Sequence, residues 1–327
     1  MSSCLAPPTL PANSEYTMTS PRFPFIALVA SLAFTLPAVA QNFDKAEIKA
    51  EKLSPTTYVL YGVGGNIGLS VGDDSVFVID DQFAPLTEKI TAAIKTITGK
   101  PVQFVLNTHW HGDHTGGNEN FGKAGALIVA HENVRKRMST DQFIELLKSK
   151  AAASPKIALP VVTFTRDLTF HLNGDEILAF HVPNAHTDGD AIVHFKNSNV
   201  VHMGDIFFNG LYPFIDSSSG GNPDGVINAA DRVLALIDDK TRIIPGHGPV
   251  CGKADLKVYR DMLSTVNGRV KAMLKDGKKL ADILAATPSA EYDEKWGKAF
   301  ISPGRFIEML VIAHSPAAAK PSTPVAK

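Results

Sequence analysis

A short segment of the chain carries four side chains that can bind metal ions. Residues 109–114 read His-Trp-His-Gly-Asp-His and are expected on a loop rather than on a helix. Imidazole nitrogens and carboxylate oxygens are ligands that zinc takes in proteins. In an extended segment His109 and His111 point the same way, while Asp113 and His114 can turn toward a second point. The pattern therefore favours two adjacent cations over one.

Three further candidate ligands, His186, Asp205 and His247, each come shortly after a predicted strand. Alone, any one of them would more often be an ordinary turn residue than a ligand. Together with residues 109–114, they place ligand-type side chains after four successive core strands. This repetition indicates one metal-binding constellation.

The elements that must position these residues alternate between strands and helices. Strands are expected at 57–61, 67–71, 75–79, 102–106, 127–130, 161–165, 168–172, 176–182, 191–195, 199–203 and 242–244. Helices are expected at 86–97, 132–137 and 226–237, from 254 onward, and at 306–313. One mixed run before about residue 175 and another after it indicate a layered α/β domain in two similar halves.

The order and rough spacing of the candidate ligands resemble the metallo-β-lactamase superfamily over residues 50–250. The local sequences Gly204-Asp205 and Pro245-Gly246-His247-Gly248 agree with it as well. The resemblance implies a four-layer αββα sandwich with a metal site along one edge, between the two sheets. It also implies two Zn²⁺ per chain: one on His109, His111 and His186, the other on Asp113, His114 and His247, with Asp205 bridging them.

Such a site has a defined chemistry. Two divalent ions about 3.5–4 Å apart share a hydroxide whose pKa lies near neutrality, and this metal-bridging hydroxide attacks a carbonyl polarised by one ion. Asp113, the carboxylate nearest the nucleophile, is expected to shuttle a proton as well as bind metal. Asp80, at the end of a predicted strand, is the first candidate to orient a ligand imidazole, with a plain turn carboxylate as the alternative.

The residues after Asp205 offer a substrate pocket. Phe207, Phe208 and Tyr212 are expected to wall it, although they could equally be core packing. Many class B1 β-lactamases carry a lysine three residues after a metal-binding Cys, and Phe208 stands in that place here, which weakens a lactam assignment of the usual kind. An Asp bridge instead of Cys is more similar to glyoxalase II and the lactonases.

The N-terminal residues are predicted to be a leader. An apolar run at 23–36 follows Arg22 and precedes the sequence Ala-Val-Ala, so a signal peptide is expected to be cleaved between Ala40 and Gln41. The run is shorter than the ~20 apolar residues of a membrane span, which favours a cleaved signal over an uncleaved anchor. Translation is expected to start at Met18. The mature protein would then be periplasmic or secreted, without stable membrane insertion.

Composition sets the remaining bounds. A net charge of −1 argues against a nucleic-acid-binding face. Two cysteines exclude a disulfide framework and a Cys-rich zinc module, and only Cys251 remains after the leader is lost. The expected organisation is a leader at 1–40, one metallo-β-lactamase-fold domain at 41–315 and a disordered tail at 316–327. The expected partner is a small-molecule substrate, and the sequence predicts no oligomeric state.

Some conspicuous residues favour ordinary structural roles. The glycine-rich segment 62–68 joins two strands, so it is no dinucleotide loop and is either a flap near the site or a simple turn. The basic run 135–137 is expected to be a solvated helix face. Six histidines are expected to be structural: His131, His171, His181, His194, His202 and His314.

Three functional hypotheses follow. Export fits an antibiotic-hydrolysing role, so the first is an exported dizinc hydrolase that opens β-lactams, weakly or promiscuously. The second is the same chemistry on a lactone, ester or thioester. The third is a mono-iron oxygenase resembling the persulfide dioxygenases, or a metal-binding protein without catalysis.

Overall fold

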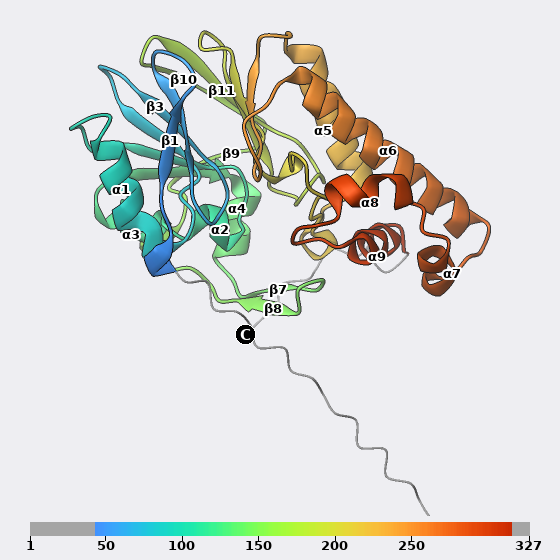
Figure 1. Cartoon of the computed structure of the whole chain (residues 1–327). Helices are drawn as coiled ribbons and strands as arrows, with labels where there is room; N and C mark the ends of the chain where they lie inside the picture. Colours follow the sequence, from blue (N-terminus) through green and yellow to red (C-terminus); the bar gives the residue numbers. More distant parts are fainter. Residues whose placement is uncertain (1–42, 316–327) are drawn as a thin grey trace, which may run out of the picture. The chain divides into compact units, whose positions relative to one another are not determined.

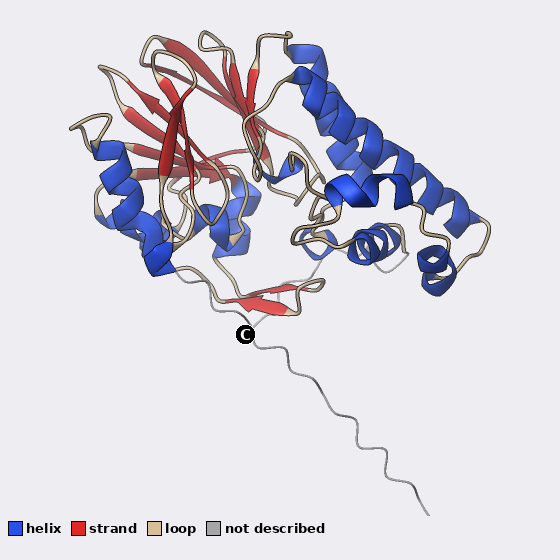
Figure 2. Cartoon of the chain, viewed as in Figure 1, coloured by secondary structure: helices blue, strands red, loops and turns tan. Residues whose placement is uncertain are grey.

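Two β-sheets face each other across an apolar core in the computed structural model, which describes residues 43–315 (Figures 1 and 2). The predicted signal peptide, its cleavage site and the predicted tail at 316–327 lie outside these residues. Within the described part of the chain, no helix is both long enough and apolar enough to cross a membrane.

The two sheets combine antiparallel hairpins with parallel pairs. The first has the order β1(Lys49–Lys52), β2(Thr57–Tyr61), β3(Ile67–Val71), β4(Val76–Ile79), β5(Phe104–Asn107), β6(Leu127–His131) and β9(Val162–Phe164). The second has the order β10(Asp167–Leu172), β11(Asp175–His181), β12(Ala191–Phe195), β13(Val200–His202) and β14(Arg242–Ile244). Parallel pairing joins β4, β5, β6 and β9 in the first sheet, and β13 with β14 in the second. A separate hairpin joins β7(Gln142–Ile144) and β8(Ser149–Ala151).

Alternating side chains explain why both faces of these strands are buried. In β4, Phe77 and Ile79 belong to the core between the sheets, while Val76 and Val78 pack toward helices on the outer face. Because successive side chains of a strand point to opposite faces, an uninterrupted apolar run of this kind needs cover on both sides. The sequence of β4 therefore requires a layered fold.

Helices cover the outer face of each sheet, as Figure 1 shows. The helices in the first half of the chain are α1(Thr87–Lys95), α2(Gly112–Thr115), α3(Asn118–Lys123) and α4(Glu132–Met138). Those in the second half are α5(Pro223–Leu236), α6(Lys253–Lys275), α7(Leu280–Ala285), α8(Ala290–Trp296) and α9(Pro303–Ala313). Phe306 and Leu310 of α9 share one buried cluster with Val266 of α6. The predicted αββα sandwich is confirmed.

Candidate metal centre

Four chain segments bring the predicted ligands together beyond the ends of strands. One group consists of His109, His111, His186 and Asp205, and its ligand atoms lie within 4.8 Å of one another. The other group consists of Asp113, His114 and His247, and its ligand atoms meet the same limit. The structure thus gathers every candidate ligand into two adjacent groups.

Asp205 lies between the two groups. Its Oδ2 is 3.9 Å from His109 Nε2 and 3.7 Å from His186 Nε2. Its Oδ1 is 3.0 Å from His114 Nε2 and 3.4 Å from His247 Nε2. Because each carboxylate oxygen faces a different group, this side chain has the geometry of a bridging ligand.

The other ligand atoms within each group also lie close to one another. His111 Nδ1 lies 2.8 Å from His186 Nε2 in the first group. In the second, Asp113 Oδ2 lies 3.6 Å from His114 Nε2 and 3.3 Å from His247 Nε2. The side chains of Asp113 and His247 keep 27% and 26% of their surface exposed, so the second group faces solvent.

The prediction that residues 109–114 lie wholly on a loop is wrong for the second half of this segment. His111 is extended, with φ −65° and ψ 148°, and it precedes the short helical turn α2. The backbone amides of His114 and Thr115 donate to the His111 carbonyl at 3.0 and 3.1 Å. This turn directs Asp113 and His114 away from the extended pair, so the two groups separate.

The glycine-rich segment between β2 and β3 lies against the site. A Cβ on Gly65 would come within 2.1 Å of the His114 ring, and one on Gly246 within 2.1 Å of Asp205 Oδ1. The amide of Gly65 donates to the Asp113 carbonyl at 3.1 Å. Of the two alternatives for this segment, the structure therefore supports a flap beside the metal ligands.

Asp80 fixes the orientation of His114. Its Oδ2 accepts from His114 Nδ1 at 2.7 Å and from Thr108 Oγ1 at 2.7 Å, and its Oδ1 accepts from the Thr108 amide at 2.7 Å. A histidine that donates through Nδ1 keeps the lone pair of Nε2 free for a metal ion. Asp80 thus occupies the orienting position expected of it.

Asp216 orients His111 in the same way, a role that no sequence pattern predicted. His111 Nε2 donates to Asp216 Oδ2 at 3.1 Å, which leaves Nδ1 for the metal side. Ser218 and Ser219 also donate to this carboxylate. In the sequence, these residues form an ordinary polar loop. Only the folded chain places the carboxylate behind a ligand.

Several inward-facing atoms have no hydrogen-bond partner among residues 43–315. They are His109 Nε2, His114 Nε2 and Asp205 Oδ1. All three are buried, and the 3.0 Å approach of the last two lacks the angles of a hydrogen bond. Buried polar atoms are nearly always satisfied, so unsatisfied atoms converging on one point need an explanation. Imidazole nitrogens and carboxylate oxygens suit divalent metal ions, and the residues present therefore fit a metal centre.

Burial and the carboxylates set the charge of the imidazoles. Burial lowers the pKa of His186 to about 4, so it is neutral and ready to bind metal at pH 7. Burial also acts to lower the pKa of His247, but Asp205 and Asp113 outweigh it and raise that pKa to about 9. The pKa of His114 is raised well above its ordinary value, because Asp205, Asp113 and Asp80 outweigh burial.

Metal loading should therefore release protons. At pH 7 the metal-free protein holds a proton on His247, and the raised pKa of His114 favours a proton there as well, so an incoming cation must displace protons. We expect metal affinity to keep rising with pH up to about 9, the pKa of His247. Titration of the metal-free protein with zinc at several pH values measures this. An affinity that levels off near pH 7 would contradict it.

Comparison with known proteins places these residues in a family. Residues 60–248 match the family model described as the metallo-beta-lactamase superfamily. The chain belongs to the metallo-β-lactamase superfamily. Because the superfamily and its named relatives are metal-dependent hydrolases, this protein is a metal-dependent hydrolase.

Relatives in the superfamily carry different activities in their names. The metallo-beta-lactamase type 2 of Bacteroides fragilis is 22% identical over 69% of this chain and 90% of its own length. The hydroxyacylglutathione hydrolase of Pelagibacter ubique is 26% identical over 62% of this chain and 74% of its own length. These relatives leave the substrate open.

Solved structures of the superfamily share the fold. A metallo-beta-lactamase from Pontibacter korlensis has a TM-score of 0.55 and 20% identity, over 67% of this chain and 99% of its own. The sec-alkylsulfatase Pisa1 from Pseudomonas sp. has a TM-score of 0.61 and 18% identity, over 84% of this chain and 52% of its own.

Of the three residues expected to wall a pocket, only Phe208 contacts a candidate metal ligand. The Phe208 ring stacks on the His247 ring with centroids 5.1 Å apart. Phe207 instead packs on Tyr259, and Tyr212 stacks on Phe306 of α9. Both are buried in the core beneath the C-terminal helices, so the alternative of core packing holds for them.

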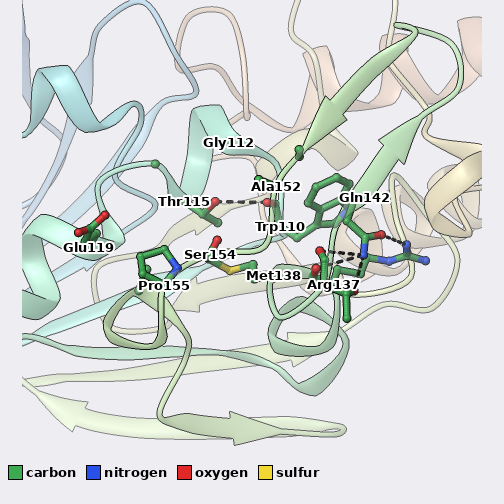
Figure 3. A pocket seen from close by; sticks show the side chains of 14 residues that line it. Trp110, Gly112, Thr115, Glu119, Arg137, Met138, Gln142, Ala152, Ser154 and Pro155 are labelled. Carbon is green, nitrogen blue, oxygen red and sulfur yellow. Dashed lines mark hydrogen bonds between the residues drawn. The ribbon is translucent and has the colours of Figure 1, made fainter. Parts of the chain in front are cut away.

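A cavity of about 190 Å³ lies beside the metal segment (Figure 3). Trp110 and Gly112 border it, but none of the candidate ligands lines it. Its most polar side chain is already engaged, because Arg137 Nε donates to Asp188 at 2.7 Å and Nη1 to Gln142 at 3.1 Å. The metal centre, rather than this cavity, is the candidate site.

The six histidines expected to be structural lie outside both metal groups within the described residues. His202 Nε2 donates to the Asn66 carbonyl at 3.0 Å. His131 and His181 stack on each other with centroids 3.8 Å apart. Their contacts serve the fold.

Proposed function

We propose that this protein is a dinuclear zinc hydrolase that cleaves ester, lactone or thioester carbonyls. The observation that carries the proposal is the placement of Asp205, whose two oxygens face two separate groups of ligands. A bridging carboxylate of this kind supports two ions close together. When bound, two zinc ions would supply a hydroxide at neutral pH and polarise the carbonyl under attack.

The chain's own residues prepare this reaction. Asp80 and Asp216 hold His114 and His111 in the orientation that presents their free nitrogens. Burial acts to raise the pKa of Asp113, but His114 and His247 outweigh it and hold the pKa at about 2. The side chain is therefore ionised and partly exposed, which lets it orient a nucleophile and relay a proton to solvent.

Two observations favour esters and thioesters over β-lactams. Phe208 brings an aromatic ring beside His247 instead of a cation that could bind the carboxylate of an antibiotic. A curated relative is named for hydrolysis of hydroxyacylglutathione. β-Lactams remain the second candidate, because the Bacteroides fragilis relative named for that activity matches over 90% of its length.

A panel of substrates tests the proposal. We expect the zinc-loaded protein to hydrolyse aryl esters, lactones or acylglutathione thioesters, with activity lost on chelation and restored by zinc. Nitrocefin and a carbapenem should be turned over more slowly. Faster turnover of either lactam would make β-lactams the substrate class, and failure on every carbonyl substrate with metal bound would overturn the proposal.

A further inference from the structure

Phe300 is a large apolar side chain that is exposed to solvent on the loop between α8 and α9. It keeps 65% of its surface exposed, whereas its neighbours Trp296 and Ile301 are only 3% and 2% exposed. The loop between α8 and α9 extends from the helices toward the strand layers (Figure 1). Because buried residues anchor this loop on both sides, Phe300 is presented in a defined position.

An aromatic contact connects Phe300 to the metal ligands. Its ring lies 6.3 Å from that of Phe214 at an interplanar angle of 85°. The Phe214 ring in turn lies 5.7 Å from His111 and 5.6 Å from His186. Phe300 is therefore the outermost ring in a series of ring contacts that runs through Phe214 to two ligand imidazoles.

Two cations beside this loop already have partners of their own. Lys298 forms an ion pair with Glu294, and Arg305 donates to the Leu146 carbonyl at 2.6 Å.

We propose that Phe300 forms the outer wall of the substrate site and binds an apolar acyl group. This inference rests on the proposed function and names its substrate class. An exposed aromatic ring gains free energy when an alkyl chain covers it, and the gain grows with the buried area. Phe300 lies outside the residues 60–248 that match the family model, so the C-terminal helices would supply this specificity.

A chain-length series tests the wall. For p-nitrophenyl esters from acetate to octanoate, we expect kcat/KM of the wild-type protein to rise by up to about fourfold per added methylene. In Phe300→Ala we expect kcat/KM to fall below the wild-type value, mainly through a higher KM. The decrease should grow with the length of the acyl chain and reach about tenfold for octanoate. Phe300→Leu should recover most of it. Leu236→Ala, which alters an apolar side chain of α5 that is 52% exposed, is the control and should change nothing.

Binding to the metal-free protein gives a readout without catalysis. Octanamide titrations followed by the fluorescence of Trp296 and Trp110 should show a Kd about tenfold higher in Phe300→Ala than in wild type. Unchanged chain-length dependence and unchanged octanamide binding in Phe300→Ala would overturn the wall while leaving the hydrolase intact. Octanamide binding that depends on Phe300, without turnover of any ester, would support the wall and contradict the proposed function.

Discussion

Replacing Asp205 with asparagine is expected to lower kcat/KM by more than about 100-fold, because loss of a residue that merely orients a ligand already costs 10- to 100-fold. One carboxylate oxygen is replaced by an amide nitrogen, which has no lone pair available for a metal ion. The side chain can then no longer serve both ligand groups. Activity and bound zinc, measured on the same preparation, check this. Zinc content should fall together with activity.

A matched control separates this effect from loss of folding. Asp175 is also buried, and its oxygens accept from the amides of Asn197 and Ser198, away from the metal centre. Asp175→Asn should lower thermal stability but keep the wild-type zinc content. If Asp205→Asn retained both zinc and wild-type kcat/KM, the bridging role would be wrong.

Asp80→Asn is expected to lower metal affinity and activity by about 10- to 100-fold. The carboxylate accepts from His114 Nδ1 and from two groups of Thr108, and asparagine offers one acceptor oxygen instead of two. If the NH2 group of the asparagine faces His114, it donates to Nδ1 and favours the tautomer with the ring proton on Nε2. That proton occupies the position where Nε2 would bind the metal ion. Zinc titration with a competing chelator, together with kcat/KM, measures the effect.

The neighbouring Asp81 provides the control. It is also fully buried, and burial raises its pKa well above the ordinary value. Its Oδ1 accepts from the Gly117 amide at 2.9 Å, a contact that asparagine can keep. Asp81→Asn should therefore bind zinc like the wild type. If the two variants lost zinc affinity equally, the effect of Asp80→Asn would come from disturbed packing and not from the orientation of His114.

Much of the fold could be predicted because the strands have clear apolar patterns. β3 and β12 have the bounds that were expected from sequence. β1 could not be found, since Lys49–Lys52 is exposed at every position and carries no apolar alternation. Hydrogen bonds to β2, rather than its own residues, make this segment a strand.

The candidate ligands could be predicted because their residue types are rare and their spacing is regular. Asp216 and Phe300 could not, since they act only through contacts with residues far away in the sequence. Phe207 and Tyr212 show the opposite error. Their position after Asp205 indicated a pocket wall, but apolar side chains in that stretch also had to fill the core.

The metal content of the purified wild-type chain tests the central claim most directly. The bridging geometry of Asp205 predicts two zinc ions per chain, and chelation should remove both the ions and the hydrolysis of carbonyl substrates. One iron per chain, with oxygen consumed on a persulfide substrate, would contradict the account.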